Sequence, residues 1–265
     1  MFSPATDNDH ALELAHFRNS VESLHVSTEG VDDATCLRFL KARSMHINKA
    51  ANMYVQYHTW RASFVPLGHI PAEQVASELH ANKCSLQGYT RNGYPLLIAL
   101  CGNHYPNKDL DTLKRFIVHA LEKTFASAPA GIEKIVTLVD LHHVSYKNVD
   151  VKGFQLLQNY YPERLAAVYI VNVPKFFHGI WKVIARFLDQ ATKEKIVFLE
   201  NHVMAQVLLS EVDADTLPSL YGGKASVVFL QDAHVPNWSG PGSIPARKLS
   251  NTLPFCKDLD VTKSD

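Results

Sequence analysis

Two opposite charges, Glu163 and Arg164, stand at the start of a strongly apolar stretch within YYPERLAAVYIVNVP, residues 160–174. Lys195 has the same place before the next apolar run, IVFL, and Thr192 lies one helical turn before it. If the two runs are neighbouring parallel strands, Glu163 and Lys195 start at the same sheet edge, close enough to pair. Such a pair has two interpretations. It is either a salt bridge that holds two strand entries together, or a recess where a carboxylate, an ammonium and a hydroxyl bind a phosphorylated group.

A second feature is the segment KFFHGIWKVIARFLD, residues 175–189. At about 100° per residue, its apolar side chains fall within an arc of roughly 160°, and its basic side chains lie on the other side. This pattern fits a helix packed on a sheet, and it also fits a basic amphipathic helix on a membrane surface. The apolar set is Phe176, Phe177, Ile180, Trp181, Val183, Ile184, Phe187 and Leu188, and the basic set is Lys175, His178, Lys182 and Arg186.

Motifs for nucleotide and hydrolase chemistry are missing from the sequence. Neither G-x-G-x-x-G nor G-x-x-x-x-G-K-[ST] occurs, and there is no G-x-S-x-G. The fragment Gly222-Gly223-Lys224 is not a phosphate loop, because Pro218 and Ala225 stand where that loop needs Gly and Ser or Thr. The sequence therefore predicts that the protein is not an enzyme.

Composition limits the partners. The 265 residues include 26 basic and 26 acidic side chains, so the formal net charge is zero and no global field attracts nucleic acid. Four scattered cysteines without C-x-x-C predict free thiols and a cytoplasmic protein, and no apolar run is long enough to span a bilayer. H-E-x-x-H is absent, and adjacent His142 and His143 fit a strand-exit loop, so we expect no metal and no cofactor.

The elements that position these side chains change along the chain. Residues 1–70 show helical periodicity only, and Asp32-Asp33 and Asn48 are expected to cap the second and third helices. The α/β class follows for residues 71–235, where strands that are apolar on both faces predict a covered, mostly parallel sheet, and residues 236–265 form a tail. The predicted strands are 84–89 and 94–100, joined by an Asn-Gly hairpin, then 134–141, 166–173, 195–200 and 226–230, and the predicted helices between them are a short one after Pro71, 109–127 opened by Asp109 or Asp111, 150–161, 174–188 and 202–209.

Four segments in order, DDATCLRFLKARSMHINKA, YYPERLAAVYIVNVP, FLDQATKEKIVFL and LPSLYGG, resemble the CRAL-TRIO lipid-transfer family in its phosphatidylinositol-transfer, Sec-fourteen-like branch. The resemblance covers roughly residues 30–230, and WRASFVPLG is similar to compact plant members. It implies a helical lobe and a mixed sheet with helices that enclose an apolar pocket for one lipid. It also implies a gate helix that opens on membranes, here residues 174–188, with Phe177, Ile180, Trp181, Ile184 and Phe187.

The resemblance assigns roles to the charges. In the branch that binds phosphatidylinositol, the headgroup is held by an Arg after the second helix, the Glu of P-E-R, and a Thr and a Lys before the next strand. These positions are Arg43, Glu163, Thr192 and Lys195 in this chain. An alternative role for Arg43 is to complement the dipole at a helix C-terminus.

A departure from the family pattern concerns the second ligand. Members that also exchange phosphatidylcholine hold its phosphate with hydroxyl groups, and Leu97, Leu121 and Ile135 occupy three of those positions here. Thr137 and Arg164 remain as candidate contacts for a second-ligand phosphate. Since an unpaired phosphate in an apolar pocket costs several kcal/mol, we predict that phosphatidylcholine is not the second ligand in this mode. The lining expected for the acyl chains is Phe116, Ile117, Val136, Leu138, Tyr169, Val171 and Phe198.

The function implied by the resemblance is lipid transfer. The protein would bind phosphatidylinositol, exchange it during transient contact with a membrane surface, and present it to lipid kinases. We expect a cytoplasmic monomer with peripheral membrane association and no nucleic-acid partner. Alternatives are a carrier of a sterol, tocopherol or retinoid, a haem carrier, for which the sequence offers no strong axial pair, and an α/β enzyme, which the missing motifs disfavour.

Overall fold

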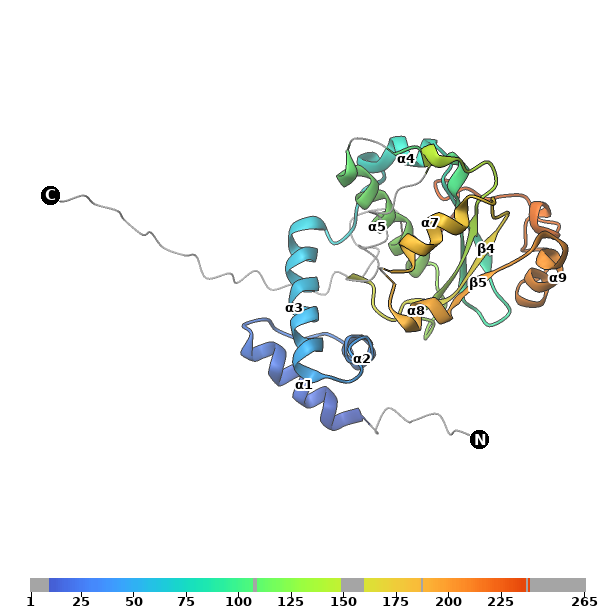
Figure 1. Cartoon of the computed structure of the whole chain (residues 1–265). Helices are drawn as coiled ribbons and strands as arrows, with labels where there is room; N and C mark the ends of the chain where they lie inside the picture. The colour runs from blue at the N-terminus through green and yellow to red at the C-terminus, as the bar shows by residue number, and fades with distance from the viewer. Residues whose placement is uncertain (1–9, 107–108, 149–159, 187, 237, 239–265) are drawn as a thin grey trace, which may run out of the picture.

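The computed structural model describes residues 10–106, 109–148, 160–186, 188–236 and 238 of the chain. Its first part is a lobe of three helices, joined to the α/β part through the third helix (Figure 1). Apolar side chains at helical spacing turn inward to form one core, in which Phe17 and Leu40 are fully buried. The helices are α1 (Ala11–Ser23), α2 (Asp33–Lys41) and α3 (Ile47–Phe64).

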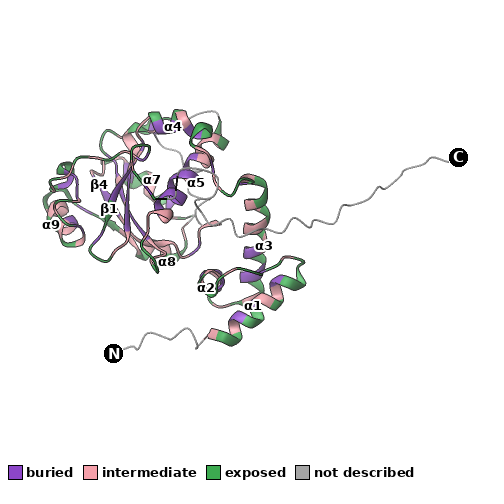
Figure 2. Cartoon of the chain, turned by 180° about the vertical axis from the view of Figure 1, so that it is seen from behind, coloured by how far each residue is buried: buried purple, intermediate pink, exposed green. Residues whose placement is uncertain are grey.

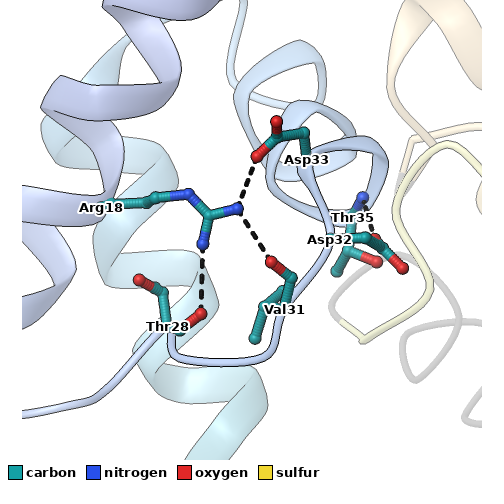
Figure 3. Close-up of polar contacts among 6 residues, drawn as sticks. All are labelled: Arg18, Thr28, Val31, Asp32, Asp33 and Thr35. Carbon is teal, nitrogen blue, oxygen red and sulfur yellow. Dashed lines mark hydrogen bonds and ion pairs between the residues drawn. The ribbon is translucent and has the colours of Figure 1, made fainter.

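Arg18 of α1 fastens the connection to α2, as Figure 3 shows. Its guanidinium donates hydrogen bonds to the carbonyl oxygens of Thr28 at 3.1 Å and Val31 at 2.8 Å. The same group lies 2.6 Å from a carboxylate oxygen of Asp33. One side chain therefore satisfies two backbone acceptors and the charge in the first turn of α2.

The predicted helix starts have different outcomes. Asp32 caps α2, and Asp109 caps α5 (Leu110–Ala126), by accepting hydrogen bonds from backbone N–H groups of the first turn. Both caps confirm the prediction. Asn48 does not cap α3, because that helix begins before it, at Ile47.

Five strands form one sheet, in the same order as in the chain. The first two strands pair antiparallel, and the other three neighbouring pairs are parallel, which confirms the predicted mostly parallel sheet. Gly93 in the first hairpin has a φ of 80°, the positive value that the Asn-Gly turn requires. The strands are β1 (Cys84–Tyr89), β2 (Pro95–Leu100), β3 (Ile135–Asp140), β4 (Leu165–Val171) and β5 (Ile196–Phe198).

The last predicted strand, 226–230, does not form as a regular strand. It runs along the outer edge of β1, where the N–H of Leu86 donates to the carbonyl of Val228 at 3.1 Å and the N–H of Leu230 donates to that of Cys84 at 3.0 Å. The segment therefore covers a sheet edge that would otherwise expose unpaired backbone groups.

Helices cover both faces of the sheet, and the inner strands β2 and β3 are its most buried ones, at the centre of the α/β part (Figure 2). The helix predicted at 174–188 is shorter, because the chain turns after residue 184 and Asp189 caps a new helix. Most of the helix predicted at 150–161 lies outside the described residues. The remaining elements are η2 (Ala72–Val75) and α4 (Ala76–His80), which follow Pro71 as predicted, η3 (Cys101–Asn103), η4 (Tyr146–Asn148), α7 (Phe177–Ile184), α8 (Gln190–Glu194), α9 (Asn201–Glu211) and η5 (Ser219–Tyr221).

Candidate functional site

Glu163 and Lys195 meet at the N-terminal edge of the sheet. β4 and β5 are parallel neighbours, and the N–H of Val168 donates to the carbonyl of Lys195 at 2.8 Å. Lys195 Nζ lies 3.3 Å from Glu163 Oε2, and the two side chains are 23% and 25% exposed. The predicted pairing of these charges is confirmed, and both groups stay within reach of solvent and of a ligand.

Thr192 lies in α8, one turn before Lys195. Its backbone N–H and its hydroxyl both donate to the carboxylate of Asp189, at 2.7 Å and 2.9 Å, as part of the helix cap. Because the hydroxyl proton is used in the cap, the oxygen of Thr192 is left to accept a hydrogen bond, for example from a ligand hydroxyl.

Arg43 follows α2, and its guanidinium donates to the carbonyl of Ala42 at 2.9 Å. Within the part of the chain that the structure describes, it makes no hydrogen bond or ion pair with the other three predicted headgroup residues. The helical lobe reaches the neighbouring strand entry through another side chain, Arg38, which pairs with Glu133 just before β3.

Arg164, a candidate contact for a second-ligand phosphate, is engaged with the protein. Its guanidinium donates to the carbonyl of Glu133 at 2.9 Å and lies 4.8 Å from the centre of the Phe125 ring. Burial lowers the pKa of Arg164 to about 10, and the nearby charge of Arg38 acts in the same direction. A phosphate would therefore have to compete with contacts that already hold this side chain.

The three positions that lack hydroxyl groups lie together. Leu97, Leu121 and Ile135 form one buried cluster, with Phe125 and Tyr161 packed on it. Thr137, the other candidate phosphate contact, follows Ile135 by two residues on the same face of β3. The surroundings of Thr137 on the side of Ile135 are consequently apolar.

Side chains alternate between the two faces of a strand, and this alternation corrects part of the predicted lining. Val136, Leu138, Tyr169 and Val171 project to the face that α9 covers, which we call the α9 face. They pack there with residues of α9 and with Tyr221, in a core on the other side of the sheet from α7. The structure does not place these four residues beside the gate helix.

The other predicted lining residues divide in the same way. Phe116 belongs to another cluster, with Val75 of η2 and Leu86 of β1. Ile117 packs on the cluster of Leu97. Phe198 contacts Trp181 of α7, with ring centres 5.0 Å apart in an edge-on arrangement. We call the face that carries Leu97 and Phe198 the α7 face.

The segment around α7 has most of the predicted amphipathic arrangement, although Val183 of the apolar set is exposed, and α7 lies across the sheet (Figure 1). Its apolar side packs against Val139, Val168 and Ile170 of the α7 face. Phe187 lies outside the described residues. Phe177 and Ile184 are buried, Ile180 and Trp181 are partly buried, and Lys175, His178, Lys182 and Arg186 are exposed.

The α7 face is less completely filled than the α9 face. In β3, the middle strand, Thr137 and Val139 on the α7 face keep partial exposure, whereas Val136 and Leu138 on the α9 face are only 4% and 0% exposed. In β4, Val168 on the α7 face is likewise partly exposed, whereas Ile170 on the same face is 5% exposed. Close packing would bury both faces of a central strand. The α7 face therefore has accessible apolar surface at the centre of the sheet.

A buried polar joint between the two parts of the molecule is absent from the sequence-based predictions. Arg61 of α3 pairs with Glu122 of α5, and the hydroxyl of Tyr161 donates to the same carboxylate at 3.2 Å. Burial raises the pKa values of Glu122 and Tyr161. Tyr161 directly precedes Pro162 and Glu163. The joint therefore fixes the position of the chain just before it reaches the Glu163–Lys195 pair. The sequence gives little signal for this joint, because Glu122 is one of several charged side chains in α5.

Other predicted features lie where they bear little on this site. Among the described residues, no helix has the length and apolar character needed to cross a membrane, and no three potential metal ligands gather. His142 and His143 occupy the turn after β3, as predicted. Burial raises the pKa values of the free thiols of Cys84 and Cys101 to about 12 each.

The chain belongs to the CRAL/TRIO domain family, since the model of that family matches residues 79–223, more than half of the sequence. The helical lobe precedes the matched region. The fold agrees with this membership: the crystal structure of Sfh5 superimposes with a TM-score of 0.62 at 25% identity, over 80% of this chain and 78% of that one.

Individual relatives match a larger share of the chain than the family model does. The Sec14 cytosolic factor of Schizosaccharomyces pombe is 29% identical over 223 residues, which are 74% of this chain and 76% of that protein. The phosphatidylinositol/phosphatidylcholine transfer protein SFH7 of Arabidopsis thaliana is 30% identical over 210 residues, which are 71% of this chain and 38% of that protein. The chain thus spans about three quarters of the first relative and less than half of the second.

Proposed function

We propose that the chain is a lipid-transfer protein that binds one phosphatidylinositol molecule between its sheet and α7 and exchanges it with membranes. The observation that carries the proposal is the accessible apolar surface at the centre of the α7 face, with the Glu163–Lys195 pair at its N-terminal edge. The same class of function is supported by two relatives, of which one is named a Sec14 cytosolic factor and the other a phosphatidylinositol/phosphatidylcholine transfer protein.

The apolar surface offsets the largest energetic cost of lipid transfer, which is the exposure of the acyl chains to water. Taking a two-chain lipid out of a bilayer exposes about thirty methylene groups to water, at a cost on the order of 25 kcal/mol. A polar contact of a few kcal/mol cannot offset this cost, so the acyl chains need a continuous apolar lining. The lining that we propose, corrected for the side of the sheet, is Leu97, Ile117, Leu121, Val139, Val168, Ile170, Ile180, Trp181 and Phe198.

The charged edge supplies selectivity for the headgroup. We assign the phosphate to Lys195 and an inositol hydroxyl donor to Glu163, because an ammonium pairs with phosphate while a carboxylate only accepts. Thr192 accepts from a second hydroxyl. Arg43 stays in the proposal as a fourth contact, which requires its guanidinium to leave the carbonyl of Ala42.

Exchange requires α7 to move, and the membrane favours that movement. The apolar side of α7 exchanges its contacts with the sheet for the bilayer interface, while Lys182 and Arg186 gain anionic lipid. We infer binding without catalysis, in a cytoplasmic monomer that associates transiently with membranes. Because the headgroup edge is partly exposed, presentation of the inositol ring to lipid kinases is compatible with the geometry.

The three positions that lack hydroxyl groups, which we call the hydroxyl-free cluster, bear on the identity of the second ligand. Leu97, Leu121 and Ile135 offer no partner to a phosphate, and Arg164 is held by the protein. We propose an uncharged second ligand, such as a sterol or a tocopherol, rather than phosphatidylcholine.

A transfer assay tests the proposed function. Labelled phosphatidylinositol in donor vesicles should move to acceptor vesicles at a rate proportional to protein concentration, and labelled phosphatidylcholine should move much more slowly. No transfer of phosphatidylinositol above the protein-free rate would refute the proposal. Equal rates for the two lipids would refute the assignment of the hydroxyl-free cluster.

A further inference from the structure

Two exposed tyrosines stand at the C-terminal edge of the sheet, opposite to the Glu163–Lys195 pair. Tyr105 follows β2 and is 64% exposed, and Tyr146 follows β3 and is 73% exposed. β2 and β3 are parallel, so the segments after them leave the sheet at the same edge. Two large rings in open water at one edge call for a physical reason.

Buried contacts hold these segments together. Asn148, which is itself buried, donates from its side-chain amide to the carbonyl of His104 at 2.7 Å and to that of Gly102 at 3.3 Å. Its side-chain oxygen accepts from the backbone N–H of Ser145 at 2.7 Å. The segments of Tyr105 and Tyr146 are therefore fixed relative to each other by a buried amide.

The same edge includes the approach to α7. The ring of Tyr146 lies 4.4 Å, centre to centre, from that of Phe176, which directly precedes α7. Lys147 and Lys175, the neighbours of these two aromatic residues in sequence, are both exposed. We call Tyr105, Tyr146, Phe176, Lys147 and Lys175 the aromatic rim.

Charge and ring chemistry together indicate the partner. Tyrosine has an apolar ring and a polar hydroxyl, which suits the interface between lipid headgroups and acyl chains. Exposed lysines beside it favour anionic lipid over neutral lipid. The first acidic residue after Tyr105 in the sequence is Asp109. Its carboxylate accepts the hydrogen bonds that cap α5.

We propose that the aromatic rim is a docking surface for an anionic bilayer. The rim is distinct from the apolar side of α7, which faces the sheet, and it holds the N-terminal end of α7 at the lipid interface. A protein partner is the competing occupant. The inference deepens the proposed function by naming the lipid surface that the carrier contacts while α7 opens.

Vesicle co-sedimentation of the full chain tests this surface. The double variant Y105S/Y146S should bind vesicles of phosphatidylcholine and phosphatidylserine about tenfold more weakly than the wild type. A variant with the charges reversed, K147E/K175E, should lose binding to these vesicles and change little on pure phosphatidylcholine. The matched control L67S/L220S removes two side chains of similar exposure outside the rim and should bind as the wild type does.

Lipid content separates the failure of this inference from the failure of the proposed function. Phosphatidylinositol bound to purified Y105S/Y146S, counted by mass spectrometry, should equal that of the wild type. If both rim variants sediment as the wild type does, or if the wild type does not sediment with either vesicle, the rim is not a membrane surface. If the wild type carries no phosphatidylinositol but the rim variants lose vesicle binding, the proposed function fails and the rim stands.

Discussion

Replacing Lys195 with alanine removes the cation that lies 3.3 Å from Glu163. Because the two side chains are 23% and 25% exposed, the ion pair contributes at most about 1 kcal/mol to the free energy of unfolding. For a chain of this size, the melting temperature should fall by about 2–4 °C. A hydrogen bond from an ammonium to a phosphate contributes about 1.5–3 kcal/mol, so the affinity for phosphatidylinositol should fall by about 10- to 150-fold.

The loss should be at the upper end of that range, because the remaining carboxylate of Glu163 repels the phosphate. Transfer of labelled phosphatidylinositol between vesicles is the assay, with thermal unfolding measured on the same preparation. Lys224→Ala is the matched control, since it removes a lysine from an exposed ion pair with Asp215 away from the site. Unchanged transfer by Lys195→Ala, with the control also unchanged, would remove Lys195 from the headgroup site.

Three further predictions concern stability. Arg61→Met should lower the free energy of unfolding by about 3 kcal/mol in urea titrations, because Glu122 is left buried without its cation; addition of Glu122→Leu should restore most of the loss. Burial holds the pKa of His119 below its ordinary value of 6.5, so below pH 6.5 the unfolded chain binds more protons than the folded one and the free energy of unfolding falls as the pH drops. His119→Gln should reduce this acid sensitivity. The same dependence of unfolding free energy on pH in the variant and the wild type would contradict the reasoning. Gly223→Ala should cost at least about 2 kcal/mol, since a Cβ there would lie 1.9 Å from the carbonyl oxygen of Leu217; a melting temperature equal to that of the wild type would disprove this close approach.

The edge that brings the charges together is predictable from sequence. If two apolar runs that start at Glu163 and Lys195 and are separated by a helical segment are neighbours in one sheet, they are parallel and their first residues share one edge, as the structure shows. The pairing then follows from chain direction alone, with no knowledge of side-chain packing. The amphipathic pattern of α7 is predictable for the same reason, because helical periodicity is local.

The side of the sheet that faces α7 cannot be predicted in this way. β3 and β4 are apolar on both faces, so the period of two separates their residues into two sets without saying which set α7 covers. Val136 and Leu138 are as apolar as Val139 and Ile170, and only the path of the chain after β5, which takes α9 to the other face, distinguishes them. The error in the predicted lining comes from this ambiguity.

Long-range polar partners are also beyond the reach of local patterns. Glu122 and Arg61 are far apart in sequence, and α5 carries several other charged side chains, so the sequence does not show that Glu122 is the one that is buried or which residue is its partner. The aromatic rim similarly depends on Asn148, which joins segments on either side of α5.

The account depends most on a lipid being held on the α7 face of the sheet. Lipid extracted from the purified full chain and identified by mass spectrometry measures this directly. The account predicts phosphatidylinositol at a ratio approaching one molecule per chain, with little phosphatidylcholine. A protein that purifies without any bound phosphoinositide, and takes none up from vesicles, would contradict it.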